Sequence, residues 1–127
     1  MDSPAVPLVN HSLLTGVEKL VHDVDVAIQG PLHDLPLSKP WQRALVSRLE
    51  EASRCVQVLR LTRAMGRPGA EVAESAQKLS AAMRAVNAYA LPSRADIGTK
   101  TTIHIGFGLA QRIAAELAHP AEGAQDT

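Results

Sequence analysis

The stretch from residue 40 to residue 66 carries the longest uninterrupted helical pattern in the chain. Apolar residues recur in it at steps of four and three, which places them along one stripe of an α-helix. The stripe consists of Leu45, Leu49, Ala52, Val56 and Leu59. Pro40 suits the first turn with Ser38 as the cap, and Gly66 suits the C-terminal end. Such a helix spans about 40 Å, so it requires partners of similar length.

Two further segments show regular helical periodicity. The first helix is expected to start between His11 and Thr15 and to stop at Gly30-Pro31, because proline cannot continue the hydrogen-bond ladder. The third is expected over about 70–91, where apolar residues alternate steps of four and three, a pattern typical of a bundle seam.

The segment after Pro92 is less regular. β-Branched residues between Thr99 and Ile105 and glycines at 98, 106 and 108 disfavour helix, so this stretch taken alone resembles a strand. An isolated strand would have no partner in the chain. We therefore expect one helix over about 95–119, opened by Ser93 and Asp96 as a capping box, with glycines that allow close helix contact.

These patterns predict an all-α fold, an antiparallel up-down-up-down four-helix bundle. Residues 1–127 are expected to form a single domain, with residues 1–10 as an extended arm and residues 120–127 as a loose tail. Apolar residues make up 46% of the chain, which is enough for a core, and only Trp41, Tyr89 and Phe107 are aromatic. The core must therefore be aliphatic, which favours close helix packing.

Motifs for catalysis, metals and cofactors are not evident. Cys55 is the single cysteine, which excludes an internal disulfide, and its apolar setting favours a buried, unreactive thiol. His11, His22 and His33 are eleven residues apart, about 16 Å along a helix, which is too far for one metal ion. We expect no enzyme activity, cofactor or metal. No signal peptide or membrane span is visible, so a cytoplasmic protein is expected.

Charge is unevenly distributed although the net charge is zero. Residues 1–38 contain one lysine and five acidic residues, whereas residues 39–67 contain seven basic residues and two glutamates. This asymmetry suits antiparallel neighbouring helices, and it also suits a phosphate-binding surface. The residues predicted for such a nucleic-acid surface are Lys39, Arg43, Arg60, Arg63 and Arg67.

The central helix has a second apolar set outside its main stripe, namely Val46, Val58, Leu61 and Met65. One interpretation is a helix buried centrally in the bundle. The other is that this set packs against an identical subunit, since soluble monomers avoid exposed apolar patches.

Arg112 and His119 match in spacing the Arg…His motif of the HEPN ribonucleases, which are also helical bundles. A small HEPN-like ribonuclease is therefore the alternative function. The simpler interpretation of His119 is a helix C-terminal residue favoured by the helix dipole.

The order of the four segments resembles the four-helix-bundle family encoded in intervening sequences of bacterial large-subunit ribosomal RNA genes. That family is related to the accessory variability determinant of diversity-generating retroelements. The resemblance covers about residues 13–118, and its matching pieces are Leu35-Pro36 through Arg48-Leu49, Leu79 to Leu91, and Ile97 to Ile113.

The resemblance implies a ring-shaped homopentamer. In the retroelement branch it also implies binding of nucleic acid and a reverse transcriptase through a strongly basic surface, from which this chain departs because its net charge is zero. The expected function is thus a non-enzymatic oligomeric protein that binds RNA or an RNA-associated protein.

Overall fold

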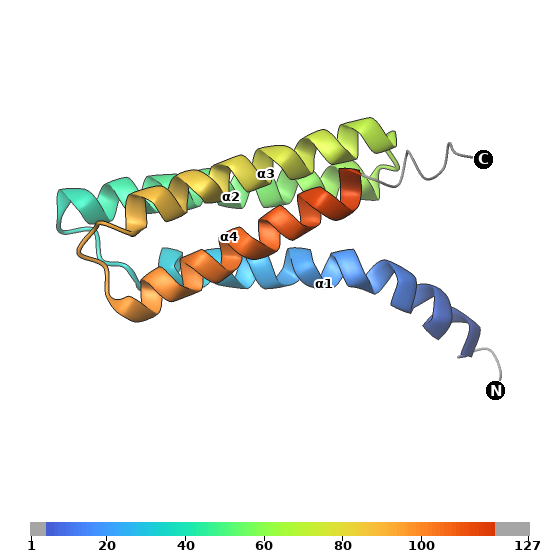
Figure 1. Cartoon of the computed structure of the whole chain (residues 1–127), viewed down its shortest axis with the longest axis horizontal. Coiled ribbons are helices and arrows are strands. Elements are labelled where there is room, and N and C mark those ends of the chain that lie inside the picture. Colours follow the sequence, from blue (N-terminus) through green and yellow to red (C-terminus); the bar gives the residue numbers. More distant parts are fainter. Residues whose placement is uncertain (1–4, 119–127) are drawn as a thin grey trace.

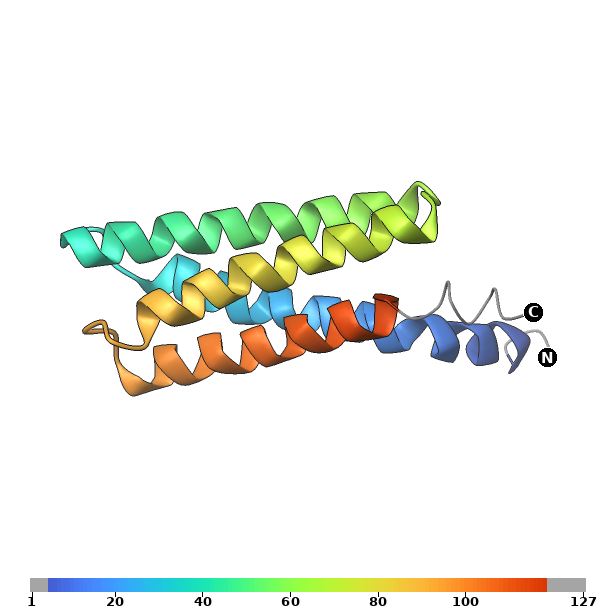
Figure 2. The same ribbon diagram turned by 45° about the horizontal axis from the view of Figure 1, so that its top comes forward.

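The structure, a computed structural model, describes the backbone of residues 5–118 and the side chains of residues 16–118. Its helices are α1 (Ala5–Asp34), α2 (Pro40–Ala64), α3 (Gly69–Ala90) and α4 (Ile97–Ala118). Successive helices run antiparallel, and α4 packs against α1 to close the bundle (Figures 1 and 2). Helices α2 and α4 lie diagonally opposite, as do α1 and α3. The predicted all-α four-helix bundle is confirmed.

All four helices contribute aliphatic side chains to one core. The stripe predicted for the central helix is confirmed, because all five of its members are fully buried. The largest fully buried side chains are Val24 and Ile28 of α1, Leu45, Leu49, Val56 and Leu59 of α2, Leu79, Met83 and Val86 of α3, and Ile103 and Ile113 of α4. Burial of each such side chain contributes about 1.5–3 kcal/mol, so this core is the main source of stability.

Helix α1 is longer than the sequence predicted. It begins at Ala5, so the expected extended arm is wrong for residues 5–10, while residues 1–4 lie outside the described part. Pro7 falls in the first helical turn, where a missing N–H removes no intrahelical bond. Proline at this position is compatible with a helix, so its presence wrongly indicated an extended arm.

The expected stop at Gly30-Pro31 is also wrong, because α1 continues to Asp34 with Pro31 inside it. Proline removes only its own N–H from the ladder, and the carbonyl of Pro31 still accepts a hydrogen bond from Leu35 N at 2.9 Å. The break therefore comes one turn later, at the connection to α2.

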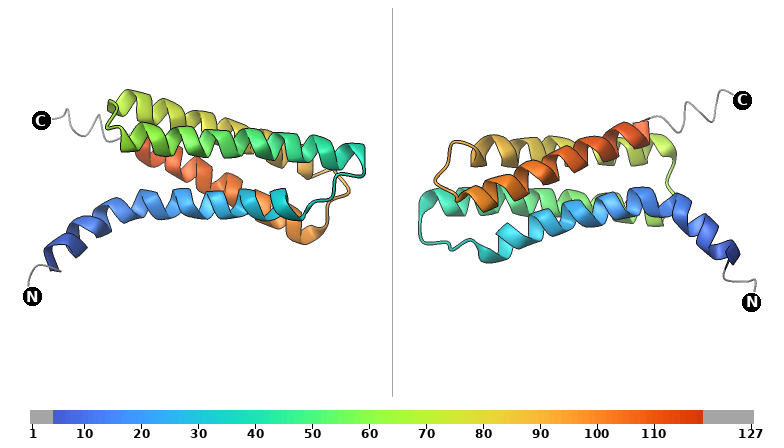
Figure 3. Two further views of the ribbon diagram at one scale, coloured as in Figure 1. Left: turned by 180° about the vertical axis from the view of Figure 1, so that it is seen from behind. Right: turned by 60° about the horizontal axis from the view of Figure 1, so that its bottom comes forward.

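The ends of α1 and the other helices cannot coincide. At 1.5 Å per residue, the 30 residues of α1 span about 45 Å, whereas the other helices span about 33–38 Å. The N-terminal part of α1 accordingly extends past the end of the bundle where α2 turns into α3 (Figures 1 and 3).

The sequence predicted the C-terminal end of α2 correctly but not its N-terminal cap. Its N-cap is Lys39 and not the predicted Ser38, because the Gln42 side chain accepts the Lys39 N–H at 3.0 Å. At its other end Gly66 takes a φ of 67°, and its N–H donates to Arg63 O at 3.1 Å. Arg67 N donates to Thr62 O at 3.2 Å, which completes the paired hydrogen bonds of a Schellman motif.

Helix α4 is continuous from Ile97 through the β-branched stretch, so the strand alternative is excluded there. It begins two residues later than predicted, and Asp96 acts as its cap by accepting Thr99 N at 3.0 Å. Hydrogen bonding from Thr99 lowers the pKa of the Asp96 carboxyl. Ser93 does not cap α4, since its hydroxyl donates to Ala90 O. The predicted tail, residues 120–127, lies outside the described part.

Gly106 marks a close contact of α4 with both α1 and α3. A Cβ at this position would lie 2.9 Å from Ala27 Cβ of α1 and 3.0 Å from Met83 Cε of α3. Ala27 Cβ is fixed to the α1 backbone, so relief of the contact would require α1 to move. The expectation that a glycine allows close helix contact is therefore confirmed at Gly106, whereas Gly108 has nothing within 4 Å.

We expect Gly106→Ala to lower the melting temperature and Gly108→Ala to raise it. Both changes improve helix propensity by about 1 kcal/mol, but at Gly106 overpacking of about 1–3 kcal/mol opposes the gain. Thermal unfolding followed by circular dichroism measures both. Equal stabilisation of the two variants would contradict the close contact.

We also expect Leu79→Asp to unfold the domain, because its site is fully buried and an unpaired charge there costs several kcal/mol. Gln77→Asp on the exposed side of α3 is the matched control and should keep the wild-type melting temperature within a few degrees. An unchanged melting temperature in Leu79→Asp would show that the core is misassigned.

Candidate interaction surfaces

The outward side of α2 carries an apolar stripe in its C-terminal half. Val58, Leu61 and Met65 are 52%, 60% and 61% exposed, and they follow each other at steps of three and four. This side points away from the buried stripe of the same helix, and α4 cannot cover it because α4 lies diagonally opposite. We call these three residues the outer stripe.

Val46 does not belong to the outer stripe. It is half-buried and lies twelve residues before Val58, about 18 Å along the helix. The four residues predicted for an oligomer interface therefore divide into three exposed neighbours and one separate position. The central-burial interpretation does not hold for the three exposed residues, while association itself stays a prediction.

A hollow of about 300 Å³ lies beside the outer stripe, lined by Glu51, Arg54, Cys55, Val58, Ser75 and Lys78. The Cys55 thiol donates to Glu51 Oε2 at 3.9 Å. Burial, followed by the charge of Glu51, raises the pKa of this thiol above its ordinary value, so it is protonated at neutral pH. The raised pKa agrees with an unreactive cysteine, but the prediction of a buried thiol is wrong, because Cys55 is only half-buried and lines a hollow with charged neighbours.

The seam between α1 and α2 is polar. Arg60 Nη1 lies 3.1 Å from Asp25 Oδ2, and Gln29 Nε2 donates to Ser53 Oγ at 3.1 Å. The acidic first segment therefore pairs with the basic second segment at Arg60, as expected for antiparallel neighbours. Arg60 thus has a structural role whether or not it meets a ligand.

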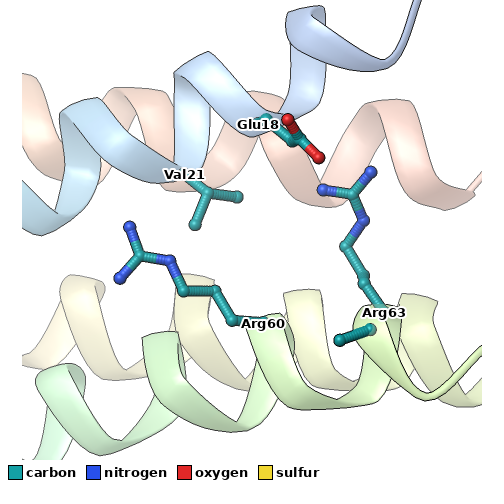
Figure 4. Close-up of a pocket in the computed structure, with 5 residues that line it drawn as sticks. Glu18, Val21, Arg60 and Arg63 are labelled. Carbon is teal, nitrogen blue, oxygen red and sulfur yellow. The ribbon is translucent and has the colours of Figure 1, made fainter. Parts of the chain in front are cut away.

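A groove of about 480 Å³ follows this seam toward the end of α2, lined by Glu18, Val21, Arg60, Arg63 and Ala64. Both arginine side chains rise from α2 toward α1, and Glu18 and Arg63 point toward one another (Figure 4). The groove is therefore mixed in charge, with guanidinium groups on one wall and a carboxylate on the other.

The five residues predicted for a nucleic-acid surface occupy two ends of α2. Lys39 and Arg43 lie at its N-terminal end, and Arg43 Nη1 donates to Leu37 O at 2.9 Å. Arg60 follows Lys39 by 21 residues, about 32 Å along the helix axis. The structure therefore does not gather all five into one patch.

Arg67 lies in the turn after α2, where its side chain pairs with Glu71 of α3. Its guanidinium contacts Glu71 at 2.9 Å, and this hydrogen bond lowers the pKa of the Glu71 carboxyl. Of the three C-terminal arginines, only Arg60 and Arg63 line the groove.

The ribonuclease alternative rests on Arg112 and His119. Arg112 is exposed on α4 with Nε 3.5 Å from Glu116 Oε2, and His119 lies outside the described residues. Their mutual geometry is thus undetermined, and the alternative stays a prediction.

A further hollow, of about 330 Å³, lies at the opposite end of the bundle from the outer stripe. It is lined by Trp41 of α2, Ala88 and Tyr89 of α3, and Pro92, Ser93 and Arg94 of the following connection. We call it the aromatic pocket. Sequence analysis missed it, because Trp41 and Tyr89 are 48 residues apart and only the pairing of α2 with α3 brings them together. The only feature of the sequence that drew attention to Trp41 and Tyr89 was that aromatic residues are so few.

No related protein was found for this chain. Searches against protein-family models, curated proteins and solved structures found no match for this chain. The resemblance to the family encoded in ribosomal RNA intervening sequences therefore remains a prediction.

Two further observations concern the part of the chain that the structure describes. None of its helices combines the length and apolar character needed to cross a membrane. The same residues contain no group of three or more His, Cys, Asp or Glu side chains that could hold a metal ion.

Proposed function

We propose that this chain is a non-catalytic cytoplasmic protein that self-associates through the outer stripe and binds RNA or an RNA-associated protein as an assembly. The observation that supports self-association is the exposure of Val58, Leu61 and Met65 on a helix whose opposite side is fully buried. Association buries this apolar surface, and each Å² removed from water stabilises the assembly by about 25 cal/mol. The ring of five subunits rests on the family resemblance alone.

The RNA component is supported by the charge of α2 and its flanks. Residues 39–67 carry five more basic than acidic residues. Five of the seven cations lie at or beside the two ends of α2, and Arg48 and Arg54 lie in its middle. Arg60 and Arg63 line the groove, whereas Arg67 is paired with Glu71. A phosphate backbone would meet these cations through salt-sensitive contacts.

We expect the purified protein to be oligomeric by light scattering at micromolar concentration, and Leu61→Glu to shift it toward monomer. The position is 60% exposed, so the added charge leaves the fold intact while it opposes burial between subunits. Val26→Glu on α1 is the matched control, since Val26 is 56% exposed and lies outside the outer stripe.

A monomeric wild-type protein would refute the self-association proposal. An oligomer that persists unchanged in Leu61→Glu would place the interface elsewhere. A dimer would refute only the pentamer.

We expect RNA affinity to fall steeply with salt, with a slope that decreases by about 0.7–0.9 for each phosphate contact removed. The triple change Arg60/Arg63/Arg67→Gln should therefore flatten the slope in a fluorescence-polarisation titration with single-stranded RNA. Lys19→Gln, an exposed cation on α1 that pairs with Asp23, is the control and should leave the slope unchanged. Salt-independent retention of RNA, or a triple variant indistinguishable from wild type, would contradict this surface.

A further inference from the structure

Aromatic residues are few in this chain, and most of them lie in the aromatic pocket. The chain has three aromatic residues, and two of them, Trp41 and Tyr89, line this one hollow from different helices. Both are half-buried, and Pro92 adds a third flat apolar group. Flat apolar walls in an open hollow suit a planar, apolar-faced ligand group rather than a flexible aliphatic chain.

The surroundings of the aromatic pocket are cationic. The guanidinium carbon of Arg48 lies 4.3 Å from the centre of the Tyr89 ring, and exposed Arg94 lines the hollow. Lys39 and Arg43 flank Trp41 in the sequence at the start of α2.

The acidic residues at this end of the bundle face a different side. Asp34 and Asp96 line a separate hollow formed where the end of α1 meets the start of α4. The α2–α3 side therefore presents arginines next to aromatic rings, while the α1–α4 side presents carboxylates.

We propose that the aromatic pocket binds an unpaired nucleobase of single-stranded RNA, with Arg94 near a flanking phosphate. A base offers a planar apolar face to Trp41 or to the Arg48–Tyr89 stack, and its backbone offers negative charge to the rim. This inference rests on the proposed RNA binding and names the chemistry and place of one contact. A proline-rich peptide would also suit aromatic walls, but a neutral peptide gives no role to the arginines.

Trp41 is the only tryptophan, so its fluorescence reports on this pocket alone. We expect saturable quenching on titration with an oligouridylate of about eight nucleotides, within the site size of one single-strand-binding module. Tyr89→Leu keeps apolar volume but removes the ring, and it should weaken binding at least about five-fold, the lower bound for loss of one stacked base. Circular dichroism checks that this variant is folded.

Arg94→Gln provides a second, surface variant that does not threaten the fold. It should weaken oligouridylate binding and lower the salt slope by about 0.7. Arg84→Gln is its matched control, because Arg84 is also an exposed arginine but lies over Phe107, at 5.6 Å from the ring centre. The effect of Arg94→Gln should exceed that of Arg84→Gln.

The outcomes separate this inference from the function on which it rests. Oligouridylate binding seen by polarisation without Trp41 quenching, and unaffected by Tyr89→Leu, would overturn the pocket and leave RNA binding intact. Absence of RNA binding in every assay would overturn both. Quenching by an oligoproline peptide that displaces the oligouridylate would make the pocket a peptide site and overturn the nucleobase assignment.

Discussion

The close approach of α4 to α1 at Gly106 is the constraint on which the shape of this bundle depends. A side chain at Gly106 would collide with Ala27, so the missing Cβ allows α1 to lie directly against α4. The opposite side of α1 meets α2 through polar pairs, Asp25 with Arg60 and Gln29 with Ser53. Tight apolar packing on one side and a polar seam on the other explain why the open groove lies between α1 and α2.

The same close packing places the aromatic residues at the edges of the bundle. The core is filled by Val, Ile, Leu, Met and Ala, and no aromatic side chain is among its fully buried members. Trp41, Tyr89 and Phe107 are half-buried against its margin instead. Two of them carry an arginine over the ring, which combines cationic and π character at the surface. The aromatic pocket is thus a consequence of a core built for close helix contact.

Sequence periodicity correctly predicted features that are determined within a single helix. It predicted the buried stripe of α2 and the role of Gly66, because both follow from local geometry. It failed at Pro7 and Pro31, because proline is tolerated in a first turn and costs only one hydrogen bond near a last turn. It could not predict the aromatic pocket, since the register of α2 against α3 depends on contacts between helices rather than on the pattern of either one.

The geometry of the outer stripe also limits how an assembly can form. From Val58 to Met65 the stripe runs about 10 Å, too short to supply the roughly 800 Å² per partner of a standard interface. A subunit contact centred there must extend over neighbouring surface, and the hollow around Cys55 and Lys78 is contiguous with it through Val58. That hollow is mixed in charge, so a partner must present polar groups beside its apolar ones.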